Sequence, residues 1–426
     1  MKVVISEDTN TSKWVHAFQG KSQVAVRGVE QYSFSHVADR KYAEYPSLSS
    51  KELVVGKLLG KGAFCVVFEV TEIKRRRTSN NTVTKDVEAQ PLNTNCNDFN
   101  QMRNSTKAIN SDTTKMKDEN GMVHRLSRKG SNLLKKKEDR EDNHSNCFQN
   151  DDAKYAIKMV NTTIDPSFVH DAMIDLAIEA RFLAILDHPN IIRLRAIRQG
   201  NPCENGFFLL LDRIVDTLEV RFHQWKIADC RTKKNISKIT DPKGKKKISL
   251  FQERINAAIE IAMGMQYIHS LNIIYRDLKP ENIGFDMKGR IKIFDFGLSR
   301  ELHENYSNKD GTYKLTGCIG SLRYMAPEVA LYQSYNTKVD VYAYSMVLWE
   351  MLALVQPFET FDAKMHYELV VKGDYRPMIS KHLSPVLKKA LKCCWSSQSS
   401  ERLSFRELVI LLSGEISMNQ RGKFLQ

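Results

Sequence analysis

One short segment, residues 273–282, constrains the fold more than any other part of the chain. It reads Ile-Ile-Tyr-Arg-Asp-Leu-Lys-Pro-Glu-Asn and places Asp277, Lys279 and Asn282 within six residues. A stretch with helical apolar spacing, about 251–271, precedes it, so we expect these polar side chains in a loop at the end of a long helix. A carboxylate, an ammonium and an amide in one loop can meet at a single reacting centre.

A second carboxylate follows at a spacing that a tight hairpin explains. Residues 283–294 have a strand pattern around the turn Asp286-Met287-Lys288-Gly289, and Asp295-Phe296-Gly297 comes directly after them. Asn282 and Asp295 can jointly offer oxygen ligands, which Mg²⁺ prefers, while waters and substrate phosphates fill its other positions. The pattern therefore predicts a magnesium site beside Asp277.

The N-terminal half supplies a second set of polar residues. Residues 53–70 are predicted to form two strands joined by the turn Gly60–Gly62, which by itself fits an ordinary hairpin as well as a phosphate-binding loop. Lys158, in the Tyr-Ala-Ile-Lys stretch of a strand predicted over 154–160, can reach phosphates held under the N–H groups of that turn. An amphipathic helix over 166–186 would present Glu179 to Lys158 as an ion pair. A solvated charge at a strand end is the alternative for Lys158 alone.

The order of the predicted elements gives the fold class. Two more strands, around 191–198 and 206–212, complete a small lobe of five antiparallel strands and one main helix, and long helices dominate after Asp212. We predict an α+β fold with a small β lobe and a larger, mainly helical lobe over residues 50–415.

Two polar insertions interrupt this pattern. Residues 71–152 are rich in Asn, Ser, Thr, Lys and Asp without periodicity, and we expect a disordered insertion. Residues 226–250 hold nine Lys or Arg against two Asp and are expected to form a mobile basic insertion after the hinge. Residues 1–45 form an unassigned extension and 416–426 a C-terminal tail.

Composition excludes several classes of protein. Apolar residues make up 42% of the chain, but no run is long enough to cross a membrane, and eight scattered cysteines show no zinc or disulfide spacing. We expect a soluble chain in the cytoplasm. The lysine runs at 135–137 and 245–247 also fit nuclear localisation or an anionic partner, although a solvated surface is the commoner reason for such runs and no DNA-binding fold accompanies them.

Taken in order, these segments resemble the signature set of eukaryotic protein kinases. The resemblance spans roughly residues 53–412 outside the insertions and includes Ala326-Pro327-Glu328, with Arg402 placed to pair with Glu328. It implies a bilobal protein-kinase fold, ATP and Mg²⁺ as ligands, and protein substrates.

The resemblance also implies a role for each site residue. Asp277 would orient the substrate hydroxyl and accept its proton, Lys279 would neutralise the transferred phosphoryl group, and Asn282 and Asp295 would bind Mg²⁺. The residues implied to bind ATP lie in the glycine turn, the β lobe, its helix and the hinge: Gly60, Lys61, Gly62, Val67, Ala156, Lys158, Glu179, the gatekeeper Leu211, Asp212 and Ile214.

Three positions depart from the family pattern. Cys65 stands where the third glycine of the phosphate loop is usual. Tyr275 replaces the common His before Arg276-Asp277, and we expect its ring to pack against Phe296. Gly284 stands where the family places a large apolar residue beneath the adenine, so this floor is either looser or filled by a neighbour.

Two features indicate the kind of kinase. Lys279 resembles the serine/threonine pattern, whereas the stretch 340–350 resembles the tyrosine-kinase-like group. Arg276 resembles kinases that are switched by phosphorylation of the activation loop, for which Thr312 and Thr316 are the candidates, with ordinary polar loop residues as the alternative. Ser321 is expected in the substrate-facing loop near Asp277.

Two other functions stay open. A pseudokinase-type scaffold would bind nucleotide and partner proteins without turnover, but such proteins usually lack the equivalent of Lys158, Asp277 or Asp295, and all three are present. Alternatively, the basic insertions could be the main function, with the fold as a carrier for RNA or anionic lipid. Binding that weakens steeply with salt would indicate that function.

Overall fold

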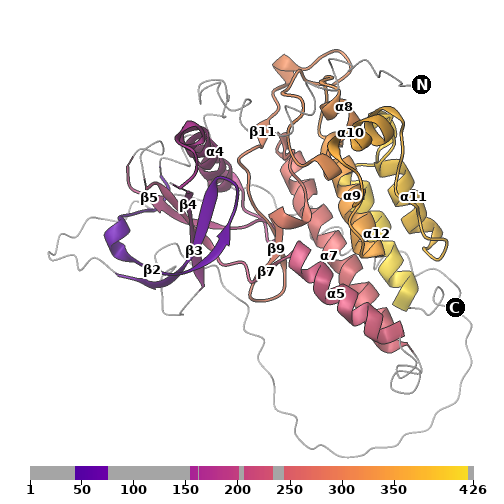
Figure 1. Ribbon diagram of the computed structural model, residues 1–426, viewed down its shortest axis with the longest axis horizontal. Coiled ribbons are helices and arrows are strands. Elements are labelled where there is room, and N and C mark those ends of the chain that lie inside the picture. The colour runs from indigo at the N-terminus through magenta and orange to yellow at the C-terminus, as the bar shows by residue number, and fades with distance from the viewer. Residues whose placement is uncertain (1–43, 75–153, 162, 201–205, 234–243, 421–426) are drawn as a thin grey trace, which may run out of the picture. The chain divides into compact units, whose positions relative to one another are not determined.

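The computed structural model describes most of the chain outside the first predicted insertion (Figure 1). The described residues are 44–74, 154–161, 163–200, 206–233 and 244–420. The predictions for residues 1–43, for 75–153 and for 234–243 therefore fall outside the described residues.

The small lobe is built on one six-stranded sheet in the order β1-β5-β6-β4-β3-β2. Its strands are β1 (Ser47–Leu48), β2 (Leu53–Lys61), β3 (Cys65–Ile73), β4 (Tyr155–Val160), β5 (Leu194–Arg198) and β6 (Phe208–Asp212). The five longer strands pair antiparallel, as predicted. The two-residue strand β1 adds to the edge in parallel with β5, and it is too short for a strand period to reveal it in the sequence.

One helix covers this sheet. Helix α4 (Pro166–Ile185) presents Ile174, Ile178 and Phe182, all at most 3% exposed, at the helical spacing that the sequence predicts. A second apolar cluster packs within the sheet and includes Leu53, Val70, Ile157, Ala196, Phe208 and Leu210. The helix thereby fixes the position of Glu179 against the sheet.

The large lobe is mainly helical (Figure 1). Its helices are α5 (Leu218–Lys233), α7 (Lys245–Ser270), α8 (Pro327–Ala330), α9 (Lys338–Ala353), α10 (Ala363–His366), the π-helical turn η7 (Tyr367–Lys372), α11 (Pro385–Cys394) and α12 (Phe405–Gln420). The short 3₁₀ turns are η2 (Ser50–Glu52), η4 (Pro280–Asn282), η5 (Glu304–Tyr306), η6 (Leu322–Tyr324) and η8 (Ser399–Glu401).

Two small sheets carry the loops of the site. The first has the order β10-β9-β7, from β7 (Asp216–Thr217), β9 (Ile283–Phe285) and β10 (Ile291–Ile293), so the predicted hairpin over 283–294 is confirmed. The second pairs β8 (Ile273–Ile274) with β11 (Arg300–Glu301).

Several predicted boundaries are wrong. Strand β3 runs to Ile73, so the first insertion cannot begin at residue 71. The basic insertion 226–250 is helical at both ends, because α5 continues to Lys233 and α7 begins at Lys245. Its lysines and arginines are good helix formers and no Gly or Pro occurs before residue 242, so charge alone does not end a helix. Helix α12 likewise continues past residue 415.

The helical core has a single large apolar cluster that reaches from α4 into the helices of the large lobe. Helix α5 packs along α7 and is anchored by Trp225, which is 3% exposed. Within the described ranges, no helix is both long enough and apolar enough to cross a membrane.

Candidate active site

A lysine from the sheet links two carboxylates from different parts of the chain. Lys158 on β4 places its Nζ 2.6 Å from Glu179 Oε2 on α4 and 2.9 Å from Asp295 Oδ1 in the loop after β10. The predicted ion pair of Lys158 with Glu179 is therefore present. Burial acts to lower the pKa of Lys158, but the charges of Asp295 and Glu179 outweigh it and hold that pKa well above its ordinary value. The lysine stays a cation at the point where the two lobes meet.

The two carboxylates differ in exposure. Glu179 is 1% exposed, and burial raises its pKa against the opposing charge of Lys158. The Asp295 side chain is 44% exposed, and the Lys158 ammonium outweighs the effect of burial and lowers the pKa of Asp295. Glu179 therefore binds the Lys158 ammonium in the protein interior, whereas the partly exposed Asp295 carboxylate is accessible to a ligand.

The loop after α7 forms a second polar cluster around Asp277. Asp277 Oδ2 accepts hydrogen bonds from Lys279 Nζ (2.7 Å) and Asn282 Nδ2 (2.9 Å). Asp277 Oδ1 accepts one from the Ser321 hydroxyl (2.9 Å), and Lys279 Nζ also donates to Ser321 Oγ (2.9 Å). Burial raises the pKa of Asp277, and the adjacent Lys279 ammonium opposes that effect. Ser321 thus lies beside Asp277, where the sequence places it.

Two site residues have a left-handed backbone. Arg276 has φ 72° and Asp295 has φ 68°, which is a backbone region that residues other than glycine rarely adopt. Asp340 on α9 holds the first of them, because its carboxylate accepts the backbone N–H groups of Tyr275 (2.9 Å) and Arg276 (2.8 Å) and lies 2.8 Å from His269 Nε2. Sequence reasoning did not assign this role to Asp340, although an aspartate in the first turn of a mostly apolar helix was an available signal.

The loop that carries Ser321 approaches the Asp277 loop very closely. Gly320 has φ 93°, and a Cβ atom there would lie 2.5 Å from the Arg276 carbonyl oxygen. Only glycine fits both the backbone conformation and the contact. This close approach is what brings the Ser321 hydroxyl to Asp277.

Asn282 and Asp295 fit a magnesium site. The Asn282 Nδ2 donates to Asp277, so the Asn282 Oδ1 is available as an acceptor. The Phe294 N–H donates to the Asn282 carbonyl (3.1 Å), which brings the next residue, Asp295, to the same loop. In the part of the chain that the structure describes, no group of three or more His, Cys, Asp or Glu could enclose a metal. Two oxygen ligands with the remaining positions open suit Mg²⁺ bound together with a phosphate.

The remaining predicted residues line the edges of the same region. Val67 lies opposite Gly60 and Lys158 in the sheet, and Ala156 lies opposite Leu211. Lys61 and Gly62 are exposed at the turn between β2 and β3.

The hinge, residues 212–215, has main-chain groups that a ligand can bind. The Asp212 carboxylate is bound by Arg195 (2.6 and 3.1 Å), and the Asp212 N–H donates to the Arg193 carbonyl (3.2 Å), so the Asp212 carbonyl is the group that a ligand can bind. Arg213 and Val215 donate their N–H groups to Lys154 and Phe285, both at 2.8 Å, while Ile214 N–H makes no main-chain hydrogen bond to a described residue.

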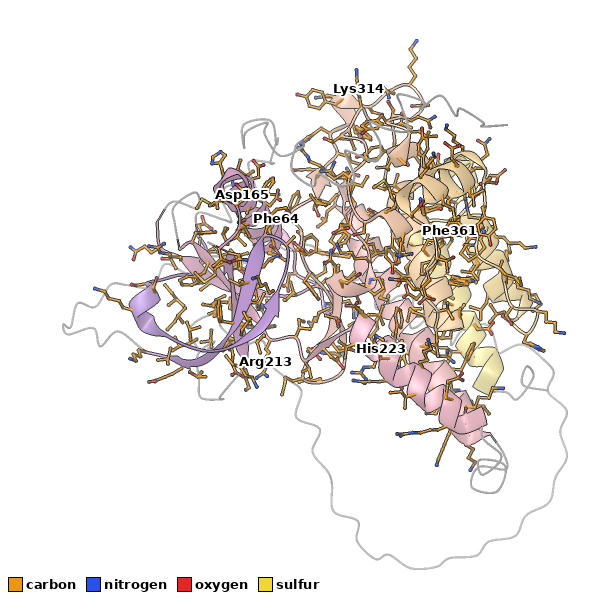
Figure 2. The ribbon with its side chains drawn as sticks, in the orientation of Figure 1. Phe64, Asp165, Arg213, His223, Lys314 and Phe361 are labelled. Carbon is orange, nitrogen blue, oxygen red and sulfur yellow. The ribbon has the colours of Figure 1, made fainter. Side chains whose placement is uncertain are left out.

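Two departures from the family pattern are accommodated. The Tyr275 ring packs edge-on against Phe296 at 5.2 Å, as predicted, and its hydroxyl donates to the Phe294 carbonyl. Burial raises the pKa of the Cys65 thiol to about 12, so this side chain acts as a small neutral group. Phe64, which is labelled in Figure 2, lies at the tip of the glycine turn, and its ring centroid is 6.2 Å from that of Phe168 on α4.

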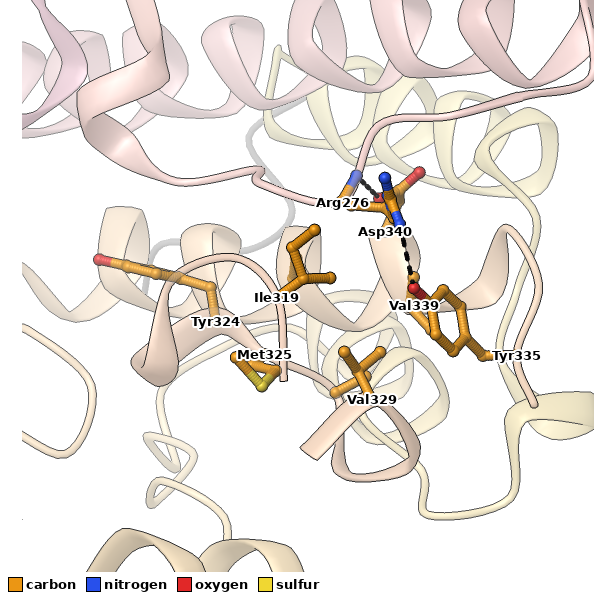
Figure 3. A pocket seen from close by; sticks show the side chains of 10 residues that line it. Arg276, Ile319, Tyr324, Met325, Val329, Tyr335, Val339 and Asp340 are labelled. Carbon is orange, nitrogen blue, oxygen red and sulfur yellow. Dashed lines mark hydrogen bonds between the residues drawn. The ribbon is translucent and has the colours of Figure 1, made fainter. Parts of the chain in front are cut away.

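Hydrogen bonds from Arg276 and Tyr335 to neutral acceptors hold the chain on both sides of β11. Arg276 donates from Nε to the Leu298 carbonyl (2.6 Å) and from Nη1 to the Tyr335 hydroxyl (3.3 Å), which in turn donates to the Thr316 carbonyl (2.7 Å). Arg276 and Tyr335 border a small pocket that Asp340 and Val329 also line (Figure 3). Tyr335 thereby links Arg276 to the segment between β11 and α8.

The predicted pair of Arg402 with Glu328 is present. Arg402 is fully buried and binds the Glu328 carboxylate with two hydrogen bonds, of 2.6 and 2.9 Å. It also donates to the carbonyl oxygens of Ser396 (2.9 Å) and Lys338 (3.1 Å). This arginine joins α8, which ends the segment that begins at β11, to the C-terminal part of the large lobe.

Sequence comparison agrees with this geometry. The family model described as the protein kinase domain matches residues 144–410. The chain is 39% identical over 163 residues to the serine/threonine-protein kinase VIK of Arabidopsis thaliana, covering 36% of each chain. It is 38% identical over 160 residues to the dual specificity protein kinase shkB of Dictyostelium discoideum (37% of this chain, 24% of that protein). It is 33% identical over 158 residues to the serine/threonine/tyrosine-protein kinase HT1 of Arabidopsis thaliana (37% and 39%). The match thus spans well under half the length of each of these curated relatives.

Proposed function

Since the chain belongs to the protein kinase family, we propose that it transfers the γ-phosphoryl group of ATP to Ser or Thr hydroxyls of protein substrates. The observation that carries this proposal is the position of Lys158, whose Nζ lies within 2.9 Å of both Glu179 and Asp295. A kinase needs this lysine and the metal-binding aspartate in place at once. This arrangement favours turnover over the alternative of a pseudokinase-type scaffold.

The cleft residues are assigned to ATP as follows. The main chain of the hinge at Asp212 and Ile214 binds the adenine edge, and Lys158 binds the α- and β-phosphates under the turn Gly60–Gly62. Val67, Ala156 and Leu211 supply apolar surface.

Asn282 and Asp295 would hold Mg²⁺. When bound, the metal would neutralise the negative charge that develops on the phosphates during transfer. The support for this assignment is the donor set: a carboxylate from Asp295 and an amide oxygen from Asn282, on two loops that the hydrogen bond from the Phe294 N–H to the Asn282 carbonyl joins.

Asp277 receives the substrate hydroxyl. Its Oδ1 is now bonded by the Ser321 hydroxyl, an arrangement that a Ser or Thr hydroxyl of a substrate can imitate or join. Lys279 bonds both Asp277 and Ser321, so its charge lies beside the path of the phosphoryl group. Because such transfer depends on positioning and charge neutralisation, losing any of these groups would reduce turnover severely.

Regulation by the activation loop is the finer part of the proposal, and Thr316 is its best candidate. The Thr316 carbonyl is linked through the Tyr335 hydroxyl to Arg276, so a phosphate on Thr316 would lie near an arginine. The Thr312 hydroxyl instead donates to Asp310 (2.7 Å), which would repel a phosphate. Mass spectrometry of active protein, with Thr316→Ala compared with Thr312→Ala, tests this choice. Full activity of Thr316→Ala would contradict it.

The enzymatic proposal is tested with radiolabelled ATP and a generic basic protein, followed by phosphoamino-acid analysis. We expect the wild type to yield phosphoserine or phosphothreonine, and Asp295→Ala and Asp277→Ala to lose transfer while remaining folded by circular dichroism. Glu359→Gln, which removes an exposed carboxylate of the large lobe, is the matched control. Near-normal turnover by either aspartate variant would refute the assigned roles.

A further inference from the structure

Gly284 lies on a strand whose two neighbours point into the helical core. Ile283 is fully buried and Phe285 is 4% exposed, with the Phe285 ring 6.5 Å from Trp225 of α5. Because side chains alternate along a strand, position 284 faces the opposite side of β9, away from the helices. Any side chain at 284 would therefore project towards the hinge and Phe294.

That space is already occupied by the side chain of Ile214. A Cβ atom built on Gly284 would lie 2.4 Å from Ile214 Cγ2, 3.0 Å from the Asp216 carbonyl oxygen and 3.1 Å from Phe294 Cε1. Real Cβ contacts essentially never fall below 3.0 Å. Positions 214 and 284 are therefore mutually exclusive: only one of them can carry a large side chain.

The backbone on either side of Ile214 is fixed. The Arg213 N–H donates to the Lys154 carbonyl and the Val215 N–H to the Phe285 carbonyl, both at 2.8 Å. Ile214 is also β-branched, so its χ1 has few accessible values. The direction of its side chain over Gly284 is thus set by the hinge itself.

The proposed nucleotide site has one apolar wall in the sheet, at Val67 and Ala156, and needs a second wall on the side of β9. A flat purine that bonds the hinge main chain lies between these two sides, and Gly284 has no side chain to offer it. We propose that the Ile214 side chain is this second wall, so that one hinge residue provides both the polar and the apolar contact to the purine. This inference rests on the proposed function, because it assumes that ATP is the ligand.

The inference predicts a pattern of loss and rescue in ADP binding, measured by calorimetry. Ile214→Ala should weaken ADP binding about tenfold or more, since it removes the apolar wall. Gly284→Leu should also weaken it, because the new side chain overlaps Ile214. The double variant Ile214→Ala/Gly284→Leu should regain affinity to within a few-fold of the wild type, because a leucine at 284 then fills the vacated space. Val215→Ala, on the adjacent exposed hinge residue, is the control and should bind ADP like the wild type.

Folding is checked by thermal unfolding of every variant. If Gly284→Leu alone does not fold, Ile214→Ala still decides the matter. The double variant adds its evidence when thermal unfolding shows that it is folded, since it lacks the overlap with Ile214 but keeps the close contacts of position 284 with the Asp216 carbonyl and Phe294. The inference is overturned if Ile214→Ala binds ADP as the wild type does, or if the double variant binds no more tightly than Ile214→Ala. In those cases the kinase assay can still succeed. A wild type that binds no ADP would instead overturn both this inference and the proposed function.

Discussion

Removal of the Tyr335 hydroxyl tests how the segment between β11 and α8, the activation segment, is kept in place. This hydroxyl is buried, with Tyr335 1% exposed, and it joins Arg276 Nη1 (3.3 Å) to the Thr316 carbonyl (2.7 Å). In Tyr335→Phe the carbonyl and one guanidinium N–H lose this partner. A buried polar group left unsatisfied costs about 1–3 kcal/mol, and the longer Arg276 bond belongs at the weak end of that range. We therefore expect a loss of about 2–3 kcal/mol in the stability of the segment.

The kinetic consequence follows from where this energy acts. About 1.4 kcal/mol corresponds to a factor of ten, so kcat/KM for a protein substrate should fall by up to about 140-fold if the ordered segment is needed for its binding. ADP affinity should not change, because neither Tyr335 nor Thr316 belongs to the proposed nucleotide site. Limited proteolysis should cut faster within residues 299–321.

The matched control is Tyr306→Phe, whose ring is 73% exposed on the same segment and should behave like the wild type. The measurements are urea unfolding followed by circular dichroism, steady-state kinetics with a peptide substrate, and proteolysis followed by mass spectrometry. A Tyr335→Phe protein whose unfolding free energy, kcat/KM and cleavage rate all match those of the wild type would refute the reasoning.

Three further changes test other parts of the structure. Arg402→Ala should lower the free energy of unfolding by about 3–5 kcal/mol in urea titrations, because it leaves Glu328 and two carbonyl groups without their partner; an effect below 1 kcal/mol would contradict this. Gly320→Ala should reduce kcat far more than ADP affinity, since its Cβ would push the Ser321 loop away from Asp277; unchanged kcat would argue against that contact. Burial, together with the charge of Lys292, lowers the pKa of His188 to about 4. The folded protein therefore resists protonation of His188, and the stability this provides above pH 6.5 is lost as the pH falls towards 4. Relative to His188→Gln, the wild type should lose up to about 2 kcal/mol between pH 7.5 and 5, and parallel pH curves would exclude this.

Patterns that lie within one or two neighbouring elements were readable from the sequence. Asp277, Lys279 and Asn282 share one loop, and the hairpin that follows has a fixed length, so spacing alone predicted that Asp295 comes close to them. The pairing of Lys158 with Glu179 was also predictable, because a strand and the helix that packs on it leave few alternatives. In each case short-range periodicity sets the geometry.

Contacts between distant segments were not readable in the same way. The overlap of Ile214 with Gly284 joins residues 70 positions apart, and only the coordinates show that the hinge side chain turns towards β9. The helical ends of the basic insertion differ from the prediction for another reason. Clustered charge is typical of a solvated loop, but lysine and arginine also favour helices when their charged groups are exposed.

Asp340 shows why the strained loop at the site needs support from far along the chain. The left-handed backbone at Arg276 would be costly in isolation, by about 1–3 kcal/mol. Two backbone N–H groups bonded by a carboxylate that is 1% exposed are charge-assisted hydrogen bonds, each of which contributes about 1.5–3 kcal/mol and together can offset that strain. Without these two hydrogen bonds the backbone before Asp277 would not be held, and the Asp277 carboxylate would lose its orientation towards Lys279 and Ser321. The buried Asp340 on α9 is therefore part of the active-site geometry, even though it lies 65 residues along the chain from Tyr275 in the loop that it holds.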